Sequence, residues 1–288
     1  MDQLTDSIRP VRKSKILRYW NSQYGYKNDI LAAEEPLEIR LNCQGSASKL
    51  HKPFMISLRT PGHDLDLITG LLYSEGLIDS IDDIVAIDFP SSFQASVTLK
   101  NKKPQEHHSR THTSNSACGA CGKSEIKMLG IDRLDKLSVR ERFCHLELDR
   151  VYEKLSNTSS LFSQTGGIHG AFLINPTDSN VLCTREDIGR HNAVDKVIGA
   201  ALRNPDTQAL LNRKSLAISS RIGFEIVQKA ANARIPVIIA LGAASSLAVE
   251  IADELNICLV GFLSSKKHNI YTHSFRLLKD ATNISATP

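Results

Sequence analysis

The last third of the chain alternates short apolar runs with amphipathic stretches, and this alternation limits the possible folds more than any other feature. Apolar runs at 215–220, 236–241 and 257–263 have the length of buried strands, and the segments at 222–233 and 245–255 between them have helical spacing. Short connections between such elements imply right-handed crossovers joining neighbouring parallel strands. The pattern therefore predicts two successive βαβ units and a parallel sheet covered by helices.

The first part of the chain has a different order. Two alternating runs, at 36–42 and 52–60, precede a segment of helical spacing that starts near Asp64, and two further strand-like runs follow it. The order strand, strand, helix, strand, strand predicts a small α+β domain over residues 34–105. We expect residues 1–33, which are largely polar, to form a weakly structured lead-in.

The middle of the chain separates these two parts. Residues 106–124 are polar and rich in His, Ser and Thr, so they can bury little and are expected to form an exposed, mobile loop. The remaining residues, 125–288, are assigned to the larger α/β domain. Besides the βαβ units, this domain is expected to contain a helix over 146–155, an apolar hairpin over 168–184 and a helix from 191 to 202.

Charge and hydropathy exclude several classes of protein. The 288 residues carry a formal net charge of +4, which is too small for bulk binding of nucleic acid but suits a pocket for an anionic small molecule. The N-terminus has no apolar run typical of a secretory signal, and the longest apolar stretch, at 236–242, is too short to cross a bilayer. We therefore expect a cytoplasmic protein that binds neither nucleic acid nor membrane.

Three loops follow the carboxyl ends of the predicted parallel strands, where open α/β sheets bind their ligands. Two of these loops open a helix, and the free N–H groups and dipole of a helix start favour an anion. The loops therefore predict a phosphate or pyrophosphate site, although capping serines and a solvated basic loop would explain any one of them alone. The candidate binding residues are Ser219, Arg221, Gly242, Ser245, Phe262, Leu263, Ser264, Ser265, Lys266 and Lys267.

A dense polar run at 184–192 borders another predicted helix. Within it, Arg185, Arg190 and His191 are candidates for binding an anionic ligand or stabilising a leaving group. A capped helix start, with Asp187 as the cap and with surface ion pairs, explains the same residues equally well.

The pair Cys118-Gly-Ala-Cys121 is the strongest local signal in the chain. Small neighbours leave both sulfurs accessible, and a thiolate is the form of cysteine that accepts or attacks sulfur. Nearby basic side chains, including Arg110 and Lys123, favour the thiolate. In a reducing compartment the pair is expected to carry redox, metal or sulfur chemistry. Four other cysteines adjoin apolar runs and are predicted to be buried packing residues: Cys43, Cys144, Cys183 and Cys258.

Alternatives to sulfur chemistry stay open for this pair. A zinc site would need two further ligands, which His107, His108 or His112 could supply. A thioredoxin-like redox motif would lie between a strand and a helix, and this pair lies in a polar loop. A zinc nucleoside deaminase is disfavoured, because its H-x-E sequence would need a glutamate where Ala171 follows His169.

Several longer motifs, taken in order, resemble those of the formate dehydrogenase accessory sulfurtransferases, the FdhD family. They extend over residues 36–272 and include TPGHDLDLITGLLYSEGLI, CGACG, GGIHGA, REDIGRHNAVDKVIGAAL, SSRIGFEIVQKAA and GAASSLAVEIA. The resemblance implies a cytidine-deaminase-like α/β domain with a parallel sheet, beside a smaller N-terminal α+β domain. It also implies a homodimer.

The resemblance implies a function as well. A cysteine desulfurase would supply sulfur, Cys118 would carry it as a persulfide with Cys121 assisting, and transfer would be stoichiometric. The acceptor would be the bis-molybdopterin guanine dinucleotide form of the molybdenum cofactor, before its insertion into the catalytic subunit of formate dehydrogenase. A family segment that contacts this cofactor corresponds to 262–267, which agrees with the predicted strand-end site. No permanently bound metal is expected. A non-catalytic chaperone that shields the cofactor is the alternative, and a zinc-dependent hydrolase is a third hypothesis.

Overall fold

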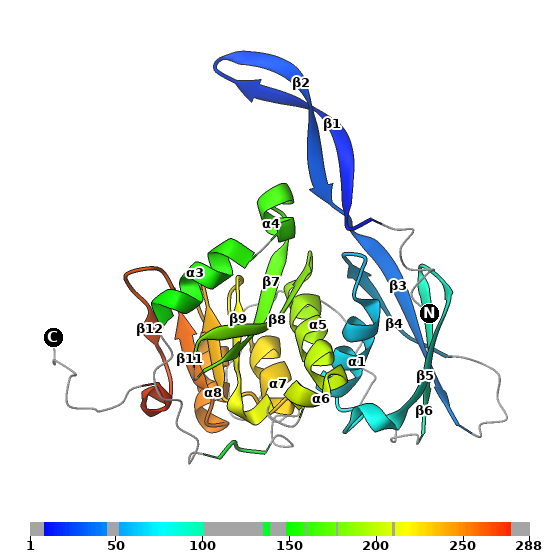
Figure 1. Cartoon of the computed structure of the whole chain (residues 1–288), viewed down its shortest axis with the longest axis vertical. Helices are drawn as coiled ribbons and strands as arrows, with labels where there is room; N and C mark the ends of the chain where they lie inside the picture. The colour runs from blue at the N-terminus through cyan, green and yellow to red at the C-terminus, as the bar shows by residue number, and fades with distance from the viewer. Residues whose placement is uncertain are drawn as a thin grey trace.

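The fold is built from three separate β-sheets and the helices that cover two of them (Figure 1). None of the helices in the described parts combines the length and the hydropathy that crossing a bilayer requires. The computed structural model describes residues 9–44, 52–100, 135–138, 148–158, 160–176, 178–208 and 211–277.

The six-stranded sheet contains the predicted βαβ units. Its three middle strands, β11, β10 and β9, are parallel, as the sequence predicts, whereas β12, β7 and β8 make antiparallel pairs and give a mixed sheet. In their order across the sheet, the strands are β12 (Asn269–Ile270), β11 (Cys258–Gly261), β10 (Val237–Ala240), β9 (Ser215–Ile218), β7 (His169–Asn175) and β8 (Asn180–Asp187).

Helices cover both faces of this sheet, which explains why its middle strands are apolar at nearly every position. Leu216, Ile238 and Leu259 face one apolar cluster, and the residues that follow them along each strand face the other. The first cluster includes side chains of α5 (Arg190–Arg203), α7 (Phe224–Asn232) and α8 (Ser246–Glu254), and the second includes side chains of α3 (Leu148–Thr158). Shorter helical segments are α4 (Ser160–Thr165), η2 (Ile81–Asp83), α6 (Pro205–Gln208), η5 (Leu211–Arg213) and η6 (Ser274–Arg276).

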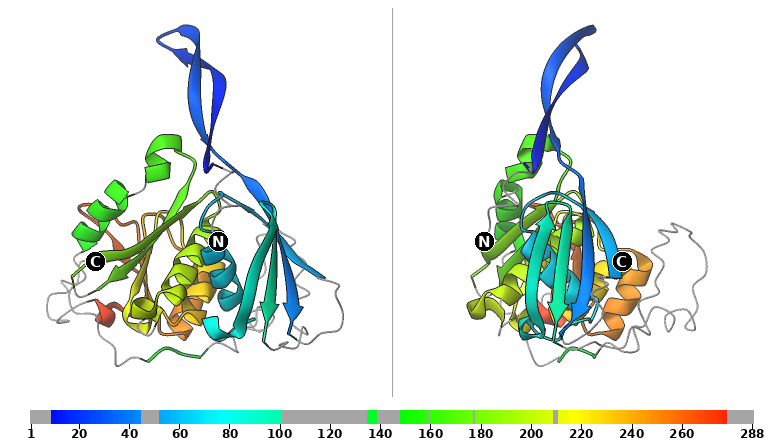
Figure 2. Two further views of the ribbon diagram at one scale, coloured as in Figure 1. Left: turned by 45° about the vertical axis from the view of Figure 1, so that its right-hand side comes forward. Right: turned by 90° about the vertical axis from the view of Figure 1, so that its right-hand side faces the viewer.

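The smaller domain has the predicted order of elements. Its strands lie in the order β4 (Lys52–Arg59), β3 (Glu35–Cys43), β6 (Gln94–Leu99) and β5 (Ile84–Ser91), and α1 (Asp64–Ser74) lies in the chain between β4 and β5. Apolar side chains of α1 pack on one face of this sheet, in a cluster separate from those of the large sheet. The right view of Figure 2 shows the four strands from the side that α1 leaves uncovered.

Helix α1 also joins the two domains, because its backbone lies directly against α5 (Figure 2, left). A Cβ atom on Gly70 would lie 1.8 Å from the carbonyl oxygen of Asp195, and one on Gly199 would lie 1.9 Å from that of Asp66. Both positions therefore need glycine, although glycine is otherwise unfavourable inside a helix. The predicted boundary between the domains, at 105–125, lies outside the described residues.

A buried polar cluster adds α7 to this pair of helices. The Lys229 ammonium group of α7 lies 2.9 Å from both carboxylate oxygens of Asp195 in α5 and 3.0 Å from the hydroxyl of Ser74 in α1. The same hydroxyl donates to Asp195 at 2.7 Å. All three side chains are almost fully buried, and each finds its hydrogen-bonding partners within the cluster.

The predicted lead-in is wrong for the part of residues 1–33 that the structure describes. Strands β1 (Val11–Trp20) and β2 (Gln23–Ala32) form a long antiparallel hairpin that projects from the body of the molecule (Figure 1). Its turn residues, Asn21 and Ser22, both have positive φ, as a two-residue type I′ turn requires. The aromatic and branched residues on both sides of this turn favour strands and could have indicated the hairpin. The polar residues among them obscured that pattern.

Candidate functional site

The three predicted loops lie next to one another at one edge of the large sheet. Strands β9, β10 and β11 all end there, because they are parallel and in register. The Gly242 N–H donates to the Ser220 carbonyl at 3.2 Å, and the Phe262 N–H donates to the Gly242 carbonyl at 2.9 Å. We call this edge, with the loops 219–223, 242–245 and 262–267, the strand-end edge. Its position is the one at which α/β sheets bind ligands.

The chain segments around β7 and β8 bring three further side chains to the strand-end edge. Strand β7 begins there with His169, and β8 ends there just before Arg190 and His191 open α5. Partial burial lowers the pKa of His169, and the positive charge of nearby Arg190 lowers it further. The His191 ring lies 2.7 Å from the carboxylate of Glu225 in the first turn of α7, and so links the starts of two helices.

Two of the helix starts at this edge have no side-chain cap. Helix α5 begins after Gly189 and α7 begins after Gly223, and neither N-cap offers a side-chain oxygen to the first N–H groups. Around Gly223 there is open space, because a Cβ atom added there would meet no heavy atom within 4 Å beyond its chain neighbours. Uncapped N–H groups together with the helix dipole make such starts suitable for phosphate.

Three of the four candidate serines have local hydrogen-bonding partners. Ser245 caps α8, since its hydroxyl accepts the Ala248 N–H at 3.2 Å. The Ser219 hydroxyl accepts the Gly170 N–H at 2.9 Å and thereby joins β9 to the start of β7. The Ser264 hydroxyl closes a turn with the backbone of Lys267. For Ser245, the capping explanation that the sequence left open is the one that the structure supports.

Most of the remaining candidate side chains of these loops are exposed, and Leu263 is the exception among them. Arg221, Ser265, Lys266 and Lys267 are exposed at the strand-end edge. Phe262, which has a φ of 53°, exposes 47% of its surface. Leu263, in contrast, is buried in the apolar cluster beneath α3, so its side chain serves packing.

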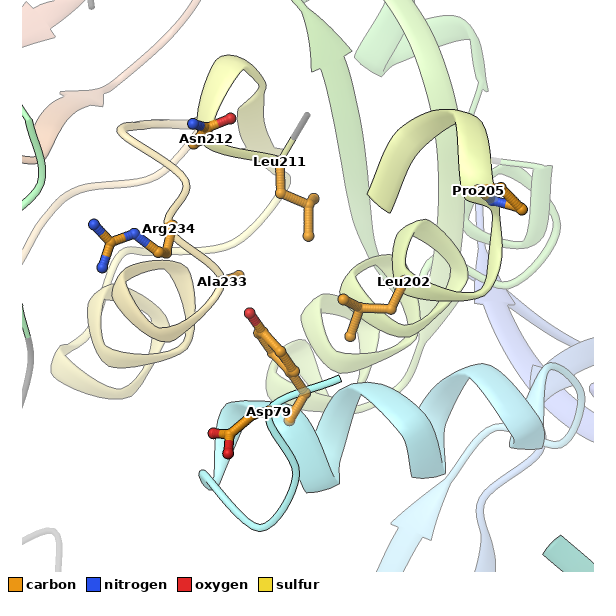
Figure 3. A pocket seen from close by; sticks show the side chains of 8 residues that line it. Asp79, Leu202, Pro205, Leu211, Asn212, Ala233 and Arg234 are labelled. Carbon is orange, nitrogen blue, oxygen red and sulfur yellow. The ribbon is translucent and has the colours of Figure 1, made fainter. Parts of the chain in front are cut away.

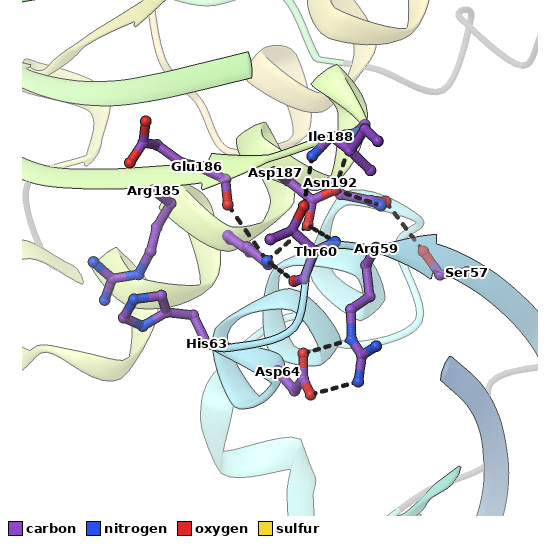
Figure 4. Close-up of polar contacts among 12 residues, drawn as sticks. Ser57, Arg59, Thr60, His63, Asp64, Arg185, Glu186, Asp187, Ile188 and Asn192 are labelled. Atoms are coloured by element: carbon purple, nitrogen blue, oxygen red, sulfur yellow. Dashed lines mark hydrogen bonds and ion pairs between the residues drawn. The ribbon is translucent and has the colours of Figure 1, made fainter. Parts of the chain in front are cut away.

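Arg185 does not join the other candidates at the strand-end edge. Its guanidinium group binds the carboxylate of Asp66 in α1, with distances of 2.8 Å from Nε and 2.7 Å from Nη2. Arg203 binds the other oxygen of the same carboxylate at 2.7 Å. Figure 4 shows Arg185 beside His63 at the start of α1. Its guanidinium group is therefore engaged at the joint between the domains, where Asp66 is shared by two arginines.

Several residues of the polar run at 184–192 also hold the two domains together (Figure 4). The buried carboxylate of Asp187 lies 2.7 Å from the Lys196 ammonium group and accepts the Thr60 N–H at 3.1 Å. Asp187 also accepts the Gly189 N–H at 2.8 Å, close to the capping role that the sequence suggested. Asn192 donates to the Leu58 carbonyl at 2.7 Å. Of this run, Arg190 and His191 lie at the strand-end edge, where Arg190 is exposed and His191 is paired with Glu225.

The described cysteines are poor candidates for thiol chemistry. Cys258 is fully buried as predicted, and burial raises its pKa to about 12. Cys183 is only half-buried, and burial again raises its pKa. Cys43 is half-buried rather than buried. The Cys118 and Cys121 pair, Cys144 and the histidines proposed as zinc ligands lie outside the described residues.

No group of three or more potential metal ligands from His, Cys, Asp or Glu occurs within the described parts of the chain. The zinc hypothesis for the cysteine loop therefore stays a hypothesis.

A separate hollow of about 500 Å³ lies away from the strand-end edge (Figure 3). Leu202, near the C-terminal end of α5, and Ala233 and Arg234, just after α7, line it together with Asp79. The C-terminal ends of helices carry the negative end of the dipole, which disfavours an anionic ligand. The predicted anion site and this hollow are therefore different places on the molecule.

The contact between His191 and Glu225 predicts a measurable dependence of stability on pH. The hydrogen bond from His191 lowers the pKa of Glu225 from 4.5 to about 2. A carboxyl group whose pKa is lowered on folding adds stability above its unfolded pKa and loses it as the pH falls to the folded pKa. We expect the parent's free energy of unfolding to fall more than that of Glu225→Gln between pH 4.5 and about 2. Urea denaturation at several pH values in this range tests the difference. An equal fall in the free energy of unfolding of the two proteins would contradict it. Solvent screening keeps the effect modest.

Comparison with known proteins identifies relatives over almost the whole chain. The model of the FdhD/NarQ family matches residues 32–278. The sulfur carrier protein FdhD of Saccharolobus solfataricus is 38% identical over 93% of this chain and 98% of its own. The protein of the same name from Sulfurisphaera tokodaii is 37% identical over 93% of this chain and 99% of its own. The protein of the same name from Nocardia farcinica is 37% identical over 94% of this chain and 96% of its own.

One solved structure has a similar fold. It belongs to a protein of Desulfotalea psychrophila provisionally described as a formate dehydrogenase accessory protein. The two structures superpose with a TM-score of 0.72, at 22% sequence identity, over 93% of this chain and all of the other. The similarity supports the mixed α/β architecture that the sequence predicts.

Proposed function

Because the chain belongs to the FdhD/NarQ family, whose relatives are named sulfur carrier proteins, we propose that it carries sulfur on Cys118 to the molybdenum cofactor of formate dehydrogenase. The cofactor, in its bis-molybdopterin guanine dinucleotide form, is the substrate that receives the sulfur. A cysteine desulfurase is the donor. A homodimer in the cytoplasm is the proposed working form.

The observation that carries the proposal is the meeting of two uncapped helix starts, those of α5 and α7, at one edge. The pyrophosphate groups of a guanine dinucleotide need such N–H groups and positive charge. Arg190 and Arg221 are exposed near these starts, and Lys266 and Lys267 are exposed on the loop after β11. These residues suit the anionic part of the cofactor, and the cysteine loop is left for the sulfur.

The proposed transfer has two balanced steps. In the first, the Cys118 thiolate attacks the outer sulfur of the donor's persulfide, a new S–S bond forms, and the donor's cysteine leaves as a thiolate. In the second, the Cys121 thiolate attacks the Cys118 sulfur and releases hydrosulfide to the cofactor. The outer sulfur gains two electrons while the two cysteines are oxidised to a disulfide. A cellular dithiol reduces this disulfide before the next cycle.

The chaperone remains the second candidate, because the strand-end edge would serve a protein that only shields the cofactor. It predicts that a chain with both cysteines replaced by alanine supports full activity of formate dehydrogenase. The sulfur-carrier proposal predicts that this activity is lost.

Replacing Cys118 with alanine should abolish loading of sulfur. Intact-protein mass spectrometry after incubation with a cysteine desulfurase and cysteine should show a gain of one sulfur atom in the parent chain, and none in Cys118→Ala. Cys183→Ala is the matched control and should keep the gain, because burial raises the pKa of that thiol. Guanosine diphosphate, which is part of the proposed cofactor, should bind all three proteins equally. Loading that survives in Cys118→Ala would refute the proposed carrier residue.

A further inference from the structure

The hairpin formed by β1 and β2 exposes large aromatic side chains far from the body of the molecule. Each strand has ten residues, so the hairpin extends roughly 30 Å. A two-stranded hairpin is marginally stable alone in water. Yet Tyr19 exposes 62% of its surface, and Trp20, Tyr24 and Tyr26 each expose 73%. Tryptophan and tyrosine in this setting are typical of the residues that dominate protein–protein binding.

The hairpin also concentrates the positive charge of the chain. Residues 11–32 contain five basic side chains and one acidic side chain, which equals the formal net charge of +4 for all 288 residues. The Lys15 ammonium group lies 4.5 Å from the centre of the Tyr26 ring, so charge and aromatic surface are interleaved. The rest of the chain is formally neutral. The net charge of a second copy would therefore not draw it to the hairpin, and its own hairpin would repel this one, so the charge favours an acidic partner.

The base of the hairpin is anchored beside the strand-end edge. Helix α4 lies beside β2, and a Cβ atom on Gly167 would touch that of Ala32 at 4.0 Å. Gly167 comes two residues before His169, with which β7 begins at this edge. Figures 1 and 2 show the hairpin rising beyond the end of the sheet where α4 and the start of β7 lie. A protein bound to the hairpin therefore lies over the strand-end edge.

We propose that the hairpin β1–β2 docks an acidic surface of the formate dehydrogenase catalytic subunit and holds that subunit over the strand-end edge. This inference rests on the proposed function. A cofactor bound at the strand-end edge can pass to another protein only if that protein lies over the same edge. The sulfur donor has no such requirement, because it needs to reach only Cys118.

Replacing the four aromatic side chains should weaken this docking strongly. We would compare the full-length parent with the variant Tyr19→Ser, Trp20→Ser, Tyr24→Ser and Tyr26→Ser for binding to purified, cofactor-free formate dehydrogenase catalytic subunit by biolayer interferometry. Loss of several central aromatic contacts should weaken binding on the order of 100-fold. Changing Lys13, Lys15 and Lys27 to Glu should also weaken binding, and should flatten its dependence on salt.

A matched control removes exposed apolar surface elsewhere. Ile56 and Leu58 of β4 expose 65% and 56% of their surfaces on the small domain. The variant Ile56→Ser and Leu58→Ser should bind the subunit as the parent does. Thermal melts followed by circular dichroism check that each variant is folded. If the aromatic variant does not fold, the affinity of the lysine variant for the subunit tests the docking proposal.

The outcomes separate failure of this inference from failure of the proposed function. A parent that neither loads sulfur nor binds guanosine diphosphate would refute the proposed function itself. If the parent does both, equal affinity of parent and aromatic variant for the catalytic subunit would overturn the hairpin proposal. If the aromatic variant binds the subunit as the parent does, either of two other changes in that variant would identify what the hairpin binds instead. One is a change from dimer to monomer in sedimentation, which would identify a second copy as the occupant. The other is loss of binding to vesicles containing phosphatidylglycerol, which would identify a membrane.

Discussion

Gly199→Ala should strongly destabilise the folded chain, even though alanine is the better helix former by about 1 kcal/mol. The added Cβ atom would lie 1.9 Å from the Asp66 carbonyl oxygen and 2.7 Å from the Gly70 nitrogen, both of them backbone atoms of α1. Backbone cannot rotate away as a flexible side chain can, so α1 and α5 would have to separate. Overpacking usually costs about 1–3 kcal/mol, and we expect a loss of about 4 kcal/mol or more here.

Urea denaturation followed by circular dichroism measures this loss. Gly167→Ala is the control, because the nearest atom to a Cβ atom there is 4.0 Å away. It should change the free energy of unfolding by less than about 1 kcal/mol. If Gly199→Ala is as stable as the parent, then α1 and α5 do not touch at this point.

Lys196→Met should be the second strongly destabilising change. The Lys196 ammonium group and the Asp187 carboxylate are 2.7 Å apart, with 1% and 0% of their side chains exposed. The substitution leaves the Asp187 charge buried without its cation, which typically costs about 3–5 kcal/mol. The double variant Asp187→Asn and Lys196→Met should be more stable than Lys196→Met, because the amide carries no charge and can still accept the Thr60 N–H.

An exposed ion pair supplies the control for this experiment. Arg234 and Asp135 are 3.4 Å apart, with 50% and 85% of their side chains exposed. Arg234→Met should therefore cost at most about 1 kcal/mol. Urea denaturation of the parent, Lys196→Met, the double variant and Arg234→Met tests this explanation. A double variant no more stable than Lys196→Met would show that the buried Asp187 charge does not cause the loss of stability.

The architecture of the large sheet could be predicted because its signal is local. Strands β9, β10 and β11 are short and apolar at nearly every position, since helices cover both faces, and each is separated from the next by one amphipathic helix. The location of the strand-end edge follows from the same alternation. The individual serines could not be assigned, because a serine that caps a helix and a serine that binds phosphate have the same local sequence.

The contacts between the domains could not be predicted, because the partners are far apart in the chain. Arg185 binds Asp66, and Asp187 binds the backbone of Thr60, and no local pattern identifies either partner. The sequence does contain a weak signal of the contact between α1 and α5, at Gly70 and Gly199. Each is an isolated glycine within a stretch of helical spacing, which often marks close packing.

The buried cluster of Lys229, Asp195 and Ser74 restricts how the molecule can move. Helices α5 and α7 both begin at the strand-end edge, and this cluster ties both of them to α1 of the small domain. A hinge between the domains would have to break the buried hydrogen bonds that Ser74 makes with Asp195 and Lys229, together with the glycine contact beside them. Any closure around a ligand at this edge must therefore come from the loops and from the hairpin, while the two domains keep one orientation.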